Sequence, residues 1–148
     1  MQRRSFIQGL VATLFVLPLH AFAAFANLVW NKQAFEATQV SKASNSFNIT
    51  NEIATNDIEL ITPDRAENGA IVQVQVTSNI PNTEAIIILV EHNPTPLIAN
   101  FTFSNGAEPF IITRIKMADN SAVKVVVKAE NQYFTTSRNV EVLSNGCG

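Results

Sequence analysis

The sequence predicts an all-β fold, an antiparallel β-sandwich with a short N-terminal helical segment and a flexible C-terminal tail. Three observations lead to it. Apolar and polar residues alternate in valine-rich stretches, turn-forming residues recur at short intervals between them, and the intervals leave no room for crossover helices. The chain has 148 residues, of which 47% are hydrophobic. That suffices for one domain with a core and not for two ordinary ones.

The first 26 residues have the pattern of an export signal. Arg3 and Arg4 form a positive start, residues 9–19 are apolar, and two small-x-small triplets between residues 21 and 26 fit the cleavage rule equally well. The apolar run is shorter than the roughly 20 residues that a membrane-spanning helix needs. We therefore interpret residues 1–26 as a cleaved signal peptide rather than as a membrane anchor.

The paired arginines are similar to those of a twin-arginine signal, a bacterial export address. Gln2 departs from the usual Ser or Thr, and an ordinary secretory signal that happens to begin with two arginines is the alternative. We favour the twin-arginine interpretation and predict a periplasmic protein.

Residues 27–143 form the predicted sandwich domain. At its start the sequence predicts a short helix that Asn31 caps, with Trp30 and Phe35 as its hydrophobic anchors. Residues 41–56 are rich in Ser, Asn and Thr, which favours a loop with weak helical tendency.

Beyond residue 57 the period changes from helical to alternating. Val72, Val74 and Val76 alternate with polar residues, which places one face of a strand in a core and the other in water. The nearly continuous apolar run at residues 85–90 is expected of a strand buried on both sides. In all, the sequence predicts eight strands, at residues 58–61, 72–76, 85–90, 98–103, 110–116, 123–127, 133–136 and 140–143.

Clusters of Asn, Gly, Pro and Asp separate these strands, and their spacing suits antiparallel hairpins. Asn and Gly tolerate a positive φ, and Pro presets the bend of a turn. The chain lacks the paired cysteines of antibody domains, so its immunoglobulin-like character is one of architecture.

Composition excludes several classes of function. Without Arg3 and Arg4 the chain keeps eight basic and 12 acidic residues, a net charge of −4, so neither nucleic acid nor an anionic membrane is an expected partner. Without His20 the only histidine is His92, and a transition-metal site normally draws several His or Cys ligands. We expect no metal and no cofactor. No nucleophile elbow or phosphate-binding loop is present, so we expect a protein that is not itself an enzyme.

The single cysteine, Cys147, is the candidate for covalent chemistry. In an oxidising compartment a lone cysteine cannot form an internal disulfide, and an exposed free thiol is a liability unless it is used. Glycines on both sides leave the backbone slim and able to bend. We predict that Cys147 is a covalent attachment site and that the residues around it form a flexible arm over 144–148, made of Ser144, Asn145, Gly146 and Gly148.

Several motifs together resemble the SoxY family, the sulfur-carrier subunits of the bacterial thiosulfate-oxidising Sox system. The resemblance runs from Trp30 to the C-terminus, and the terminal cysteine motif departs from the family's Gly-Gly-Cys-Gly-Gly ending by Asn145 and by one missing glycine. The motifs are Glu67-Asn68-Gly69-Ala70, Val90-Glu91-His92-Asn93-Pro94-Thr95-Pro96-Leu97, Thr113-Arg114-Ile115-Lys116-Met117 and Gly146-Cys147-Gly148.

The resemblance implies an immunoglobulin-like sandwich that pairs with a second small β-protein, SoxZ, as a SoxYZ heterodimer. It also implies a reaction cycle on Cys147. A c-type cytochrome couples thiosulfate to the sulfur, a hydrolase releases sulfate, and in some organisms a sulfur dehydrogenase oxidises the remaining sulfane. Export of the folded pair by the twin-arginine route is consistent with this cycle, which would take place in the periplasm.

Three alternatives remain open at this point. The chain can be a carrier of the same kind in a different sulfur route or for a quinoprotein dehydrogenase. It can be a non-enzymatic binding sandwich that dimerises through its thiol. It can also be a small thiol-dependent enzyme with His92 as the base, although nothing in the sequence brings His92 close to Cys147.

Overall fold

The computed structural model describes residues 30–143. The chain divides into two compact units, Met1–Asn31 and Lys32–Gly148, and the fold given below is that of the second unit. The predicted signal peptide at residues 1–26 and the predicted arm at residues 144–148 lie outside the described residues.

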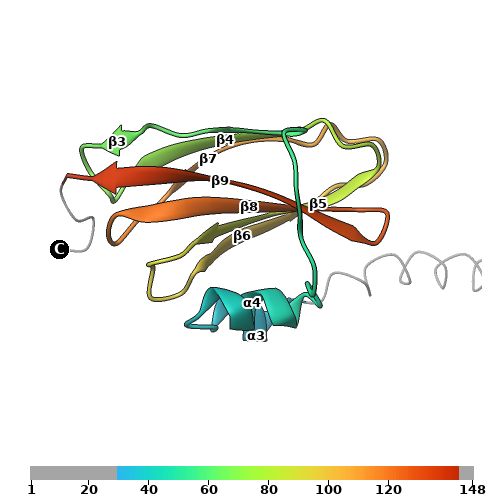
Figure 1. Cartoon of the computed structure of the whole chain (residues 1–148), viewed down its shortest axis with the longest axis horizontal. Coiled ribbons are helices and arrows are strands. Elements are labelled where there is room, and N and C mark those ends of the chain that lie inside the picture. Colours follow the sequence, from blue (N-terminus) through green and yellow to red (C-terminus); the bar gives the residue numbers. More distant parts are fainter. Residues whose placement is uncertain (1–29, 144–148) are drawn as a thin grey trace, which may run out of the picture. The chain divides into compact units, whose positions relative to one another are not determined.

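Two β-sheets form the sandwich (Figure 1). The larger sheet has the strand order β1-β9-β8-β5-β6, and β3 pairs with β9 beside it. Its strands are β1 (Ile53–Ala54), β3 (Arg65–Ala66), β5 (Thr83–Val90), β6 (Leu97–Thr102), β8 (Ser121–Ala129) and β9 (Gln132–Val142). The smaller sheet has the order β2-β4-β7, with β2 (Ile58–Ile61), β4 (Val72–Ser78) and β7 (Phe110–Ile115). The immunoglobulin-like sandwich that the sequence predicts is therefore confirmed.

The main core lies between the two sheets. Inward residues of both sheets alternate with outward ones, as the period of a half-buried strand requires, and the valines of β4 at 72, 74 and 76 are almost fully buried. Ile86, Ile88 and Val90 of β5 point into this core from the opposite sheet.

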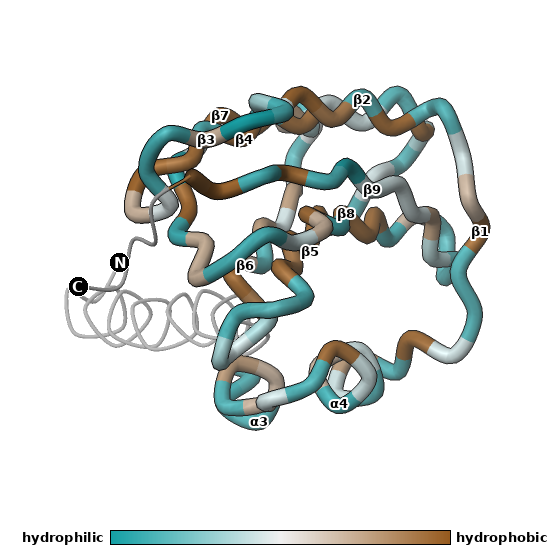
Figure 2. The backbone as a smooth tube through the Cα atoms, turned by 60° about the vertical axis from the view of Figure 1, so that its left-hand side comes forward, coloured by the Kyte–Doolittle hydropathy of each residue, from teal (hydrophilic) through white to brown (hydrophobic). Residues whose placement is uncertain are grey.

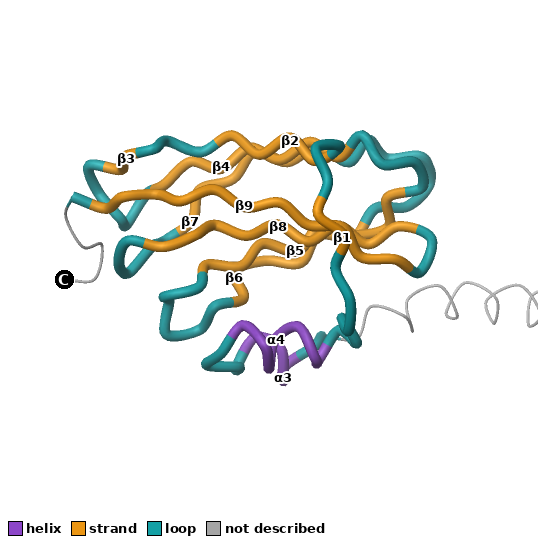
Figure 3. The backbone as a smooth tube through the Cα atoms, in the orientation of Figure 1, coloured by secondary structure: helices purple, strands orange, loops and turns teal. Residues whose placement is uncertain are grey.

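A second, smaller core lies on the outer face of the large sheet, under two short helices. They are α3 (Lys32–Phe35) and α4 (Val40–Ser46), which lie side by side below β5 and β6 in Figure 3. Ile87 and Leu89 of β5 pack there against Ala34 and Ala43 of the helices. Residues 85–90 are consequently buried on both sides of the sheet, which confirms that prediction.

The helical region differs from its prediction in two ways. A second helix, α4, occupies part of the stretch that was predicted to be mainly loop, because Val40 and Ala43 find apolar partners on the sheet. Phe35 packs against the same cluster as predicted, whereas Trp30 is 67% exposed.

The strands differ from their prediction mainly at the C-terminal end. The two segments predicted at residues 133–136 and 140–143 form one strand, β9, which pairs with β8 from Gln132 to Val140. Two very short strands, β1 and β3, were not predicted, and they pair with β9 in parallel rather than antiparallel orientation. A two-residue strand carries too little pattern to be recognised from sequence.

The turns follow the predicted chemistry. Glu130 and Asn131, which join β8 to β9, both have a positive φ, as a two-residue hairpin turn requires. Asn82 and Asn105 also have a positive φ within predicted turns.

Candidate functional site

The chain leaves the described domain at the end of β9, and this end is held on two sides. The backbone N–H of Val142 donates to the side-chain oxygen Oδ1 of Asn120 at 2.7 Å. The backbone N–H of Leu143 donates to the carbonyl oxygen of Ala66, in β3, at 2.9 Å. The last residues before the predicted arm are therefore fixed to the sandwich by backbone hydrogen bonds.

Two ion pairs add to this attachment. Nε of Arg65 lies 2.9 Å from Oε2 of Glu141, and Nη2 of Arg138 lies 2.7 Å from Oδ1 of Asp64. All four side chains are about half exposed or more, so each pair contributes little to stability. Both pairs nevertheless connect the β3 segment to β9, and they place two carboxylates and two cations around the point where the chain leaves the domain.

Cys147, the predicted attachment site, lies outside the described residues, as do Ser144, Asn145, Gly146 and Gly148. Covalent geometry still bounds its position. Three residues lie between Leu143 and Cys147, so their Cα atoms are four steps apart along the chain and cannot be separated by more than about 14 Å.

His92 lies at the same end of the sandwich, in the turn after β5. Its backbone N–H donates to Oγ of Ser121 at 3.0 Å, and its ring Nδ1 lies 2.6 Å from the carbonyl oxygen of Asn120. A carbonyl oxygen can only accept, so Nδ1 carries the proton and, in the neutral ring, the lone pair is on Nε2. His92 is thus a turn residue whose ring is hydrogen-bonded to the turn before β8 and whose backbone N–H is hydrogen-bonded to the first residue of β8.

Asn120 connects His92 to the end of β9, because its carbonyl oxygen accepts from the ring of His92 and its side chain accepts from Val142. The sequence pointed to Asn120 only as a turn residue and gave no sign of this double contact. A neighbouring loop is fixed in a similar way, since the side chain of Asn93 donates to the carbonyl oxygen of Lys116 and accepts from the N–H of Ala118.

A shallow surface depression of about 380 Å³ lies beside this network. His92, Asn120 and Asn139 contribute to its lining, together with the carboxylates of Asp64 and Glu141. Both carboxylates are in the ion pairs described above. Over residues 30–143, no three His, Cys, Asp or Glu side chains gather in a way that could hold a metal ion.

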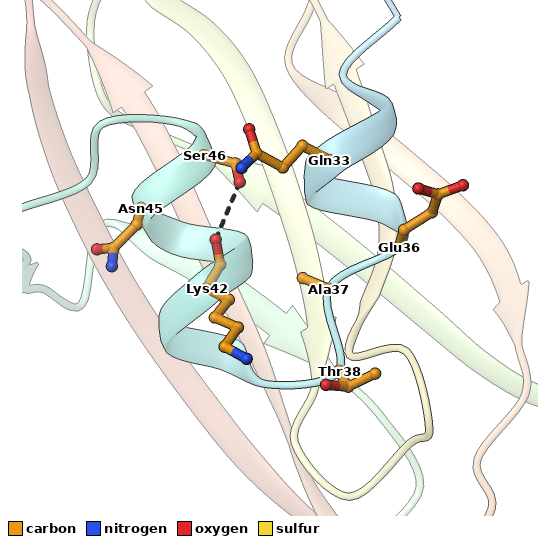
Figure 4. A pocket seen from close by; sticks show the side chains of 7 residues that line it. All are labelled: Gln33, Glu36, Ala37, Thr38, Lys42, Asn45 and Ser46. Atoms are coloured by element: carbon orange, nitrogen blue, oxygen red, sulfur yellow. Dashed lines mark hydrogen bonds between the residues drawn. The ribbon is translucent and has the colours of Figure 1, made fainter.

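A depression of about 510 Å³ between α3 and α4 is a second candidate (Figure 4). Its lining includes Gln33, Lys42 and Ser46, and the only hydrogen bond drawn there runs from Oγ of Ser46 to the carbonyl oxygen of Lys42 at 3.0 Å. In Figure 4 the side chains of Glu36 and Asn45 point away from each other. The lining offers no nucleophile with an adjacent base, so it suggests no chemistry. Within the described part of the chain, no helix has the length and apolarity to cross a bilayer.

Comparison with known proteins points to one family. The family model described as "Sulfur oxidation protein SoxY" matches residues 44–147 of this chain, a range that includes Cys147. The solved structure of the sulfur carrier protein SoxY from Chlorobium limicola f thiosulfatophilum is 30% identical, with a TM-score of 0.64 over 70% of this chain and 96% of that chain.

More distant structures show the fold alone. Two variants of a superoxide reductase (neelaredoxin) from Ignicoccus hospitalis are 15% and 14% identical, with TM-scores of 0.52 and 0.51. The alignments cover 66% and 70% of this chain and 86% and 92% of those chains. A search of curated proteins finds no match.

Proposed function

Because this chain belongs to the SoxY family of sulfur oxidation proteins, we propose that it is a covalent sulfur carrier in periplasmic thiosulfate oxidation. It binds sulfur intermediates on Cys147 and presents them to partner enzymes. A role as a carrier in sulfur oxidation is what the family shares, and the cysteine, the compartment and the partners are the specific content of the proposal.

The observation that carries the proposal is the position of the family match relative to the fold. The match extends to residue 147, past the last described strand, so it covers the position of the cysteine as well as the sandwich, which supports the proposal. The sandwich itself ends at β9, whose last amide groups are bound to Asn120 and Ala66. A fixed base followed by a short segment with one thiol is a suitable design for a carrier.

The chemistry of the cycle then takes place on one sulfur atom. The Cys147 thiolate and thiosulfate form a sulfur–sulfur bond, and the two electrons released pass to a c-type cytochrome. Water then cleaves the terminal sulfonate as sulfate in a partner hydrolase, with release of two protons, and a persulfide remains on Cys147. A sulfur dehydrogenase oxidises this sulfane where such a partner is present.

The described domain contributes binding and position rather than catalysis. His92 is the one histidine near the point where the chain leaves the domain, and its Nδ1 proton is bound to Asn120. The nearby carboxylates of Asp64 and Glu141 are paired with arginines. We therefore assign activation of the thiol to the partner enzymes, and the segment from Ser144 to Gly148 acts as the arm that enters them.

The partner set and the export route complete the proposal. A SoxZ-like β-protein forms a heterodimer with this chain, and the N-terminal signal over residues 1–26 delivers the protein to the periplasm by the twin-arginine route. The paired arginines at residues 3 and 4 and the resemblance of the whole domain support this assignment.

Reconstitution with partner proteins tests the proposal. Cys147→Ser should abolish thiosulfate-dependent reduction of the cytochrome, because serine cannot form a sulfur–sulfur bond. Ser144→Ala is the matched control, since it changes the same segment and keeps the thiol. Electron transfer that survives in Cys147→Ser, in a protein with unchanged circular dichroism, would show that the cysteine is not the carrier site.

A further inference from the structure

The outer face of the small sheet has no described element over it. The large sheet is covered on its inner face by the small sheet and on its outer face by α3 and α4. Figure 1 shows β4 and β7 at the outer edge of the molecule, on the side opposite the helices, and Figure 2 shows hydrophobic positions along β2 and β7. This open face is formed by the outward side chains of β2, β4 and β7.

The strand register places these side chains in rows. Ile61, Gln75 and Ile112 form the middle row, since Gln75 is opposite both isoleucines. On one side lies the row of Glu59, Thr77 and Phe110, and on the other side Gln73 lies opposite Arg114. The open face consists of these eight residues and of Ile71, which directly precedes β4.

Large apolar side chains are concentrated on this face. Ile61 is 45% exposed, Phe110 44% and Ile112 57%. Ile71, at the next outward position before β4, is 62% exposed. A large apolar side chain has on the order of 200 Å² of surface, so the four leave on the order of 400 Å² in water. That is the size of patch found at interaction sites, and about the apolar share of one side of a standard interface of roughly 800 Å² per partner.

The two charges on the open face lie at diagonally opposite corners. Glu59 is on the edge strand β2 and Arg114 is on the opposite edge strand β7, and the row of Gln75 lies between them. Consider two copies related by a two-fold axis that lies in the plane of this face and crosses the line from Glu59 to Arg114. This axis brings Glu59 of each copy to Arg114 of the other. The same axis passes over Gln75, whose amide can both donate to and accept from its symmetry mate. In its two charges and at Gln75 the face is therefore complementary to itself, as a two-fold interface requires.

We propose that the open face of the small sheet binds a second copy of this chain, with the two sheets packed face to face. Gln75 and Phe110 lie on the axis, and Ile61 and Ile112 flank Gln75 and pack against Gln73 and Thr77 of the other copy. Two Glu59–Arg114 pairs close the corners. This inference does not depend on the carrier function. The chain leaves the domain from β9, which belongs to the other sheet, so the interface leaves that end of the molecule uncovered.

Analytical ultracentrifugation tests whether this interface forms in solution. The sample is the protein in the form that the cell produces after processing. All samples carry Cys147→Ser, so that no disulfide can join two chains. We expect a concentration-dependent dimer, and Ile112→Gln should raise its dissociation constant at least tenfold. Ile53→Gln is the matched control, because Ile53 is 41% exposed and lies on β1, in the other sheet. A chain that stays monomeric at about 100 μM, or a dimer that Ile112→Gln does not weaken, would overturn the proposal.

Charge reversal tests the proposed symmetry separately. Arg114→Glu or Glu59→Arg alone places like charges together at both corners and should weaken the dimer severalfold, more at low salt than at high salt. The double variant restores opposite charges and should recover most of the affinity. If the double variant binds no better than either single one, the axis is wrong. If the chain is monomeric alone and a different β-protein covers the face, the partner is that protein and not a second copy.

Discussion

Oδ1 of Asn120 accepts a 2.7 Å hydrogen bond from the backbone N–H of Val142, the last residue of β9. Through its carbonyl oxygen the same asparagine holds the ring of His92. One residue of the turn before β8 thus fixes both the strand that leads to the cysteine and the only histidine of the described domain. In the proposed carrier, this contact determines how firmly the base of the arm is held.

Asn120→Ala should loosen the end of β9 without unfolding the domain. It leaves the amide of Val142 without its acceptor, and one such loss costs about 1–3 kcal/mol if the group stays buried and less if water replaces the oxygen. Hydrogen exchange at Val142 should accelerate more than exchange in the centre of β9. Asn139→Ala is the control, because Asn139 is an exposed asparagine of the same strand. Equal protection of Val142 in both variants would contradict this role for Asn120.

Ile88→Ala should be strongly destabilising. Ile88 is fully buried in the main core, and removing a buried aliphatic side chain typically costs about 2–5 kcal/mol. Ile112→Ala, on the exposed face, should change the stability of the monomer by less than about 1 kcal/mol. Urea unfolding measures both, and a similar midpoint for the two variants would mean that Ile88 is not in the core as described.

The strand pattern of the sequence was informative where side chains alternate or where a run is buried on both sides. The alternation at Val72, Val74 and Val76 predicted β4, and the run at residues 85–90 predicted β5 with cover on both faces. The sequence did not predict β9 as one continuous strand. Its middle residues are polar and mostly exposed, so no apolar pattern marks them as part of a strand. Pairing with β8 holds that stretch in the sheet, and pairing partners cannot be read from one strand.

The candidate site was also only partly predictable from the sequence. Cys147 was identifiable from residue type and position alone, because a single cysteine between glycines is conspicuous in any sequence. The contacts of Asn120 were not identifiable, since a hydrogen bond between residues 120 and 142 depends on the fold. The outer face of β7 was also not predicted as an open surface, because an alternating strand does not show which side remains uncovered.

Lys128 gives a pH-dependent contribution to stability. Its ammonium lies 2.7 Å from the carboxylate of Glu84, and this hydrogen bond raises the pKa of Lys128 above its ordinary value of 10.5. Because the pKa of Lys128 is higher in the folded state, its full contribution to stability is present below the pKa that Lys128 has in the unfolded chain. This contribution is lost as the pH rises through the pKa of Lys128 in the folded state.

The wild type should therefore be more stable than Lys128→Met by about 0.2–1 kcal/mol at neutral pH, and the difference should decrease as the pH rises above 10.5 and through the raised pKa of the folded state. Denaturant titrations at several pH values measure this. Lys116→Met is the control for removal of a charge, because its ammonium makes no ion pair among the described residues. A difference that persists unchanged at high pH would contradict the assignment.

His92→Ala should reduce stability slightly and leave sulfur loading intact. The variant loses the hydrogen bond from Nδ1 to the carbonyl oxygen of Asn120, which is worth about 0.5–1.5 kcal/mol. His92→Asn is the matched variant, because its amide can donate to the same carbonyl. Loading of Cys147 is measured by mass after incubation with partner proteins and thiosulfate. Loss of loading in both variants, with the fold retained, would favour the thiol-dependent enzyme over the carrier.

Intact mass spectrometry of the protein from thiosulfate-grown cells of its own host tests the carrier function most directly. The account predicts a population of chains with an added sulfane or thiosulfonate group, removed by reduction and located by fragmentation on Cys147. A Cys147→Ser chain expressed in the same cells should carry none. If the cysteine is found only as a free thiol or as a disulfide between two chains throughout growth on thiosulfate, the protein is not a sulfur carrier.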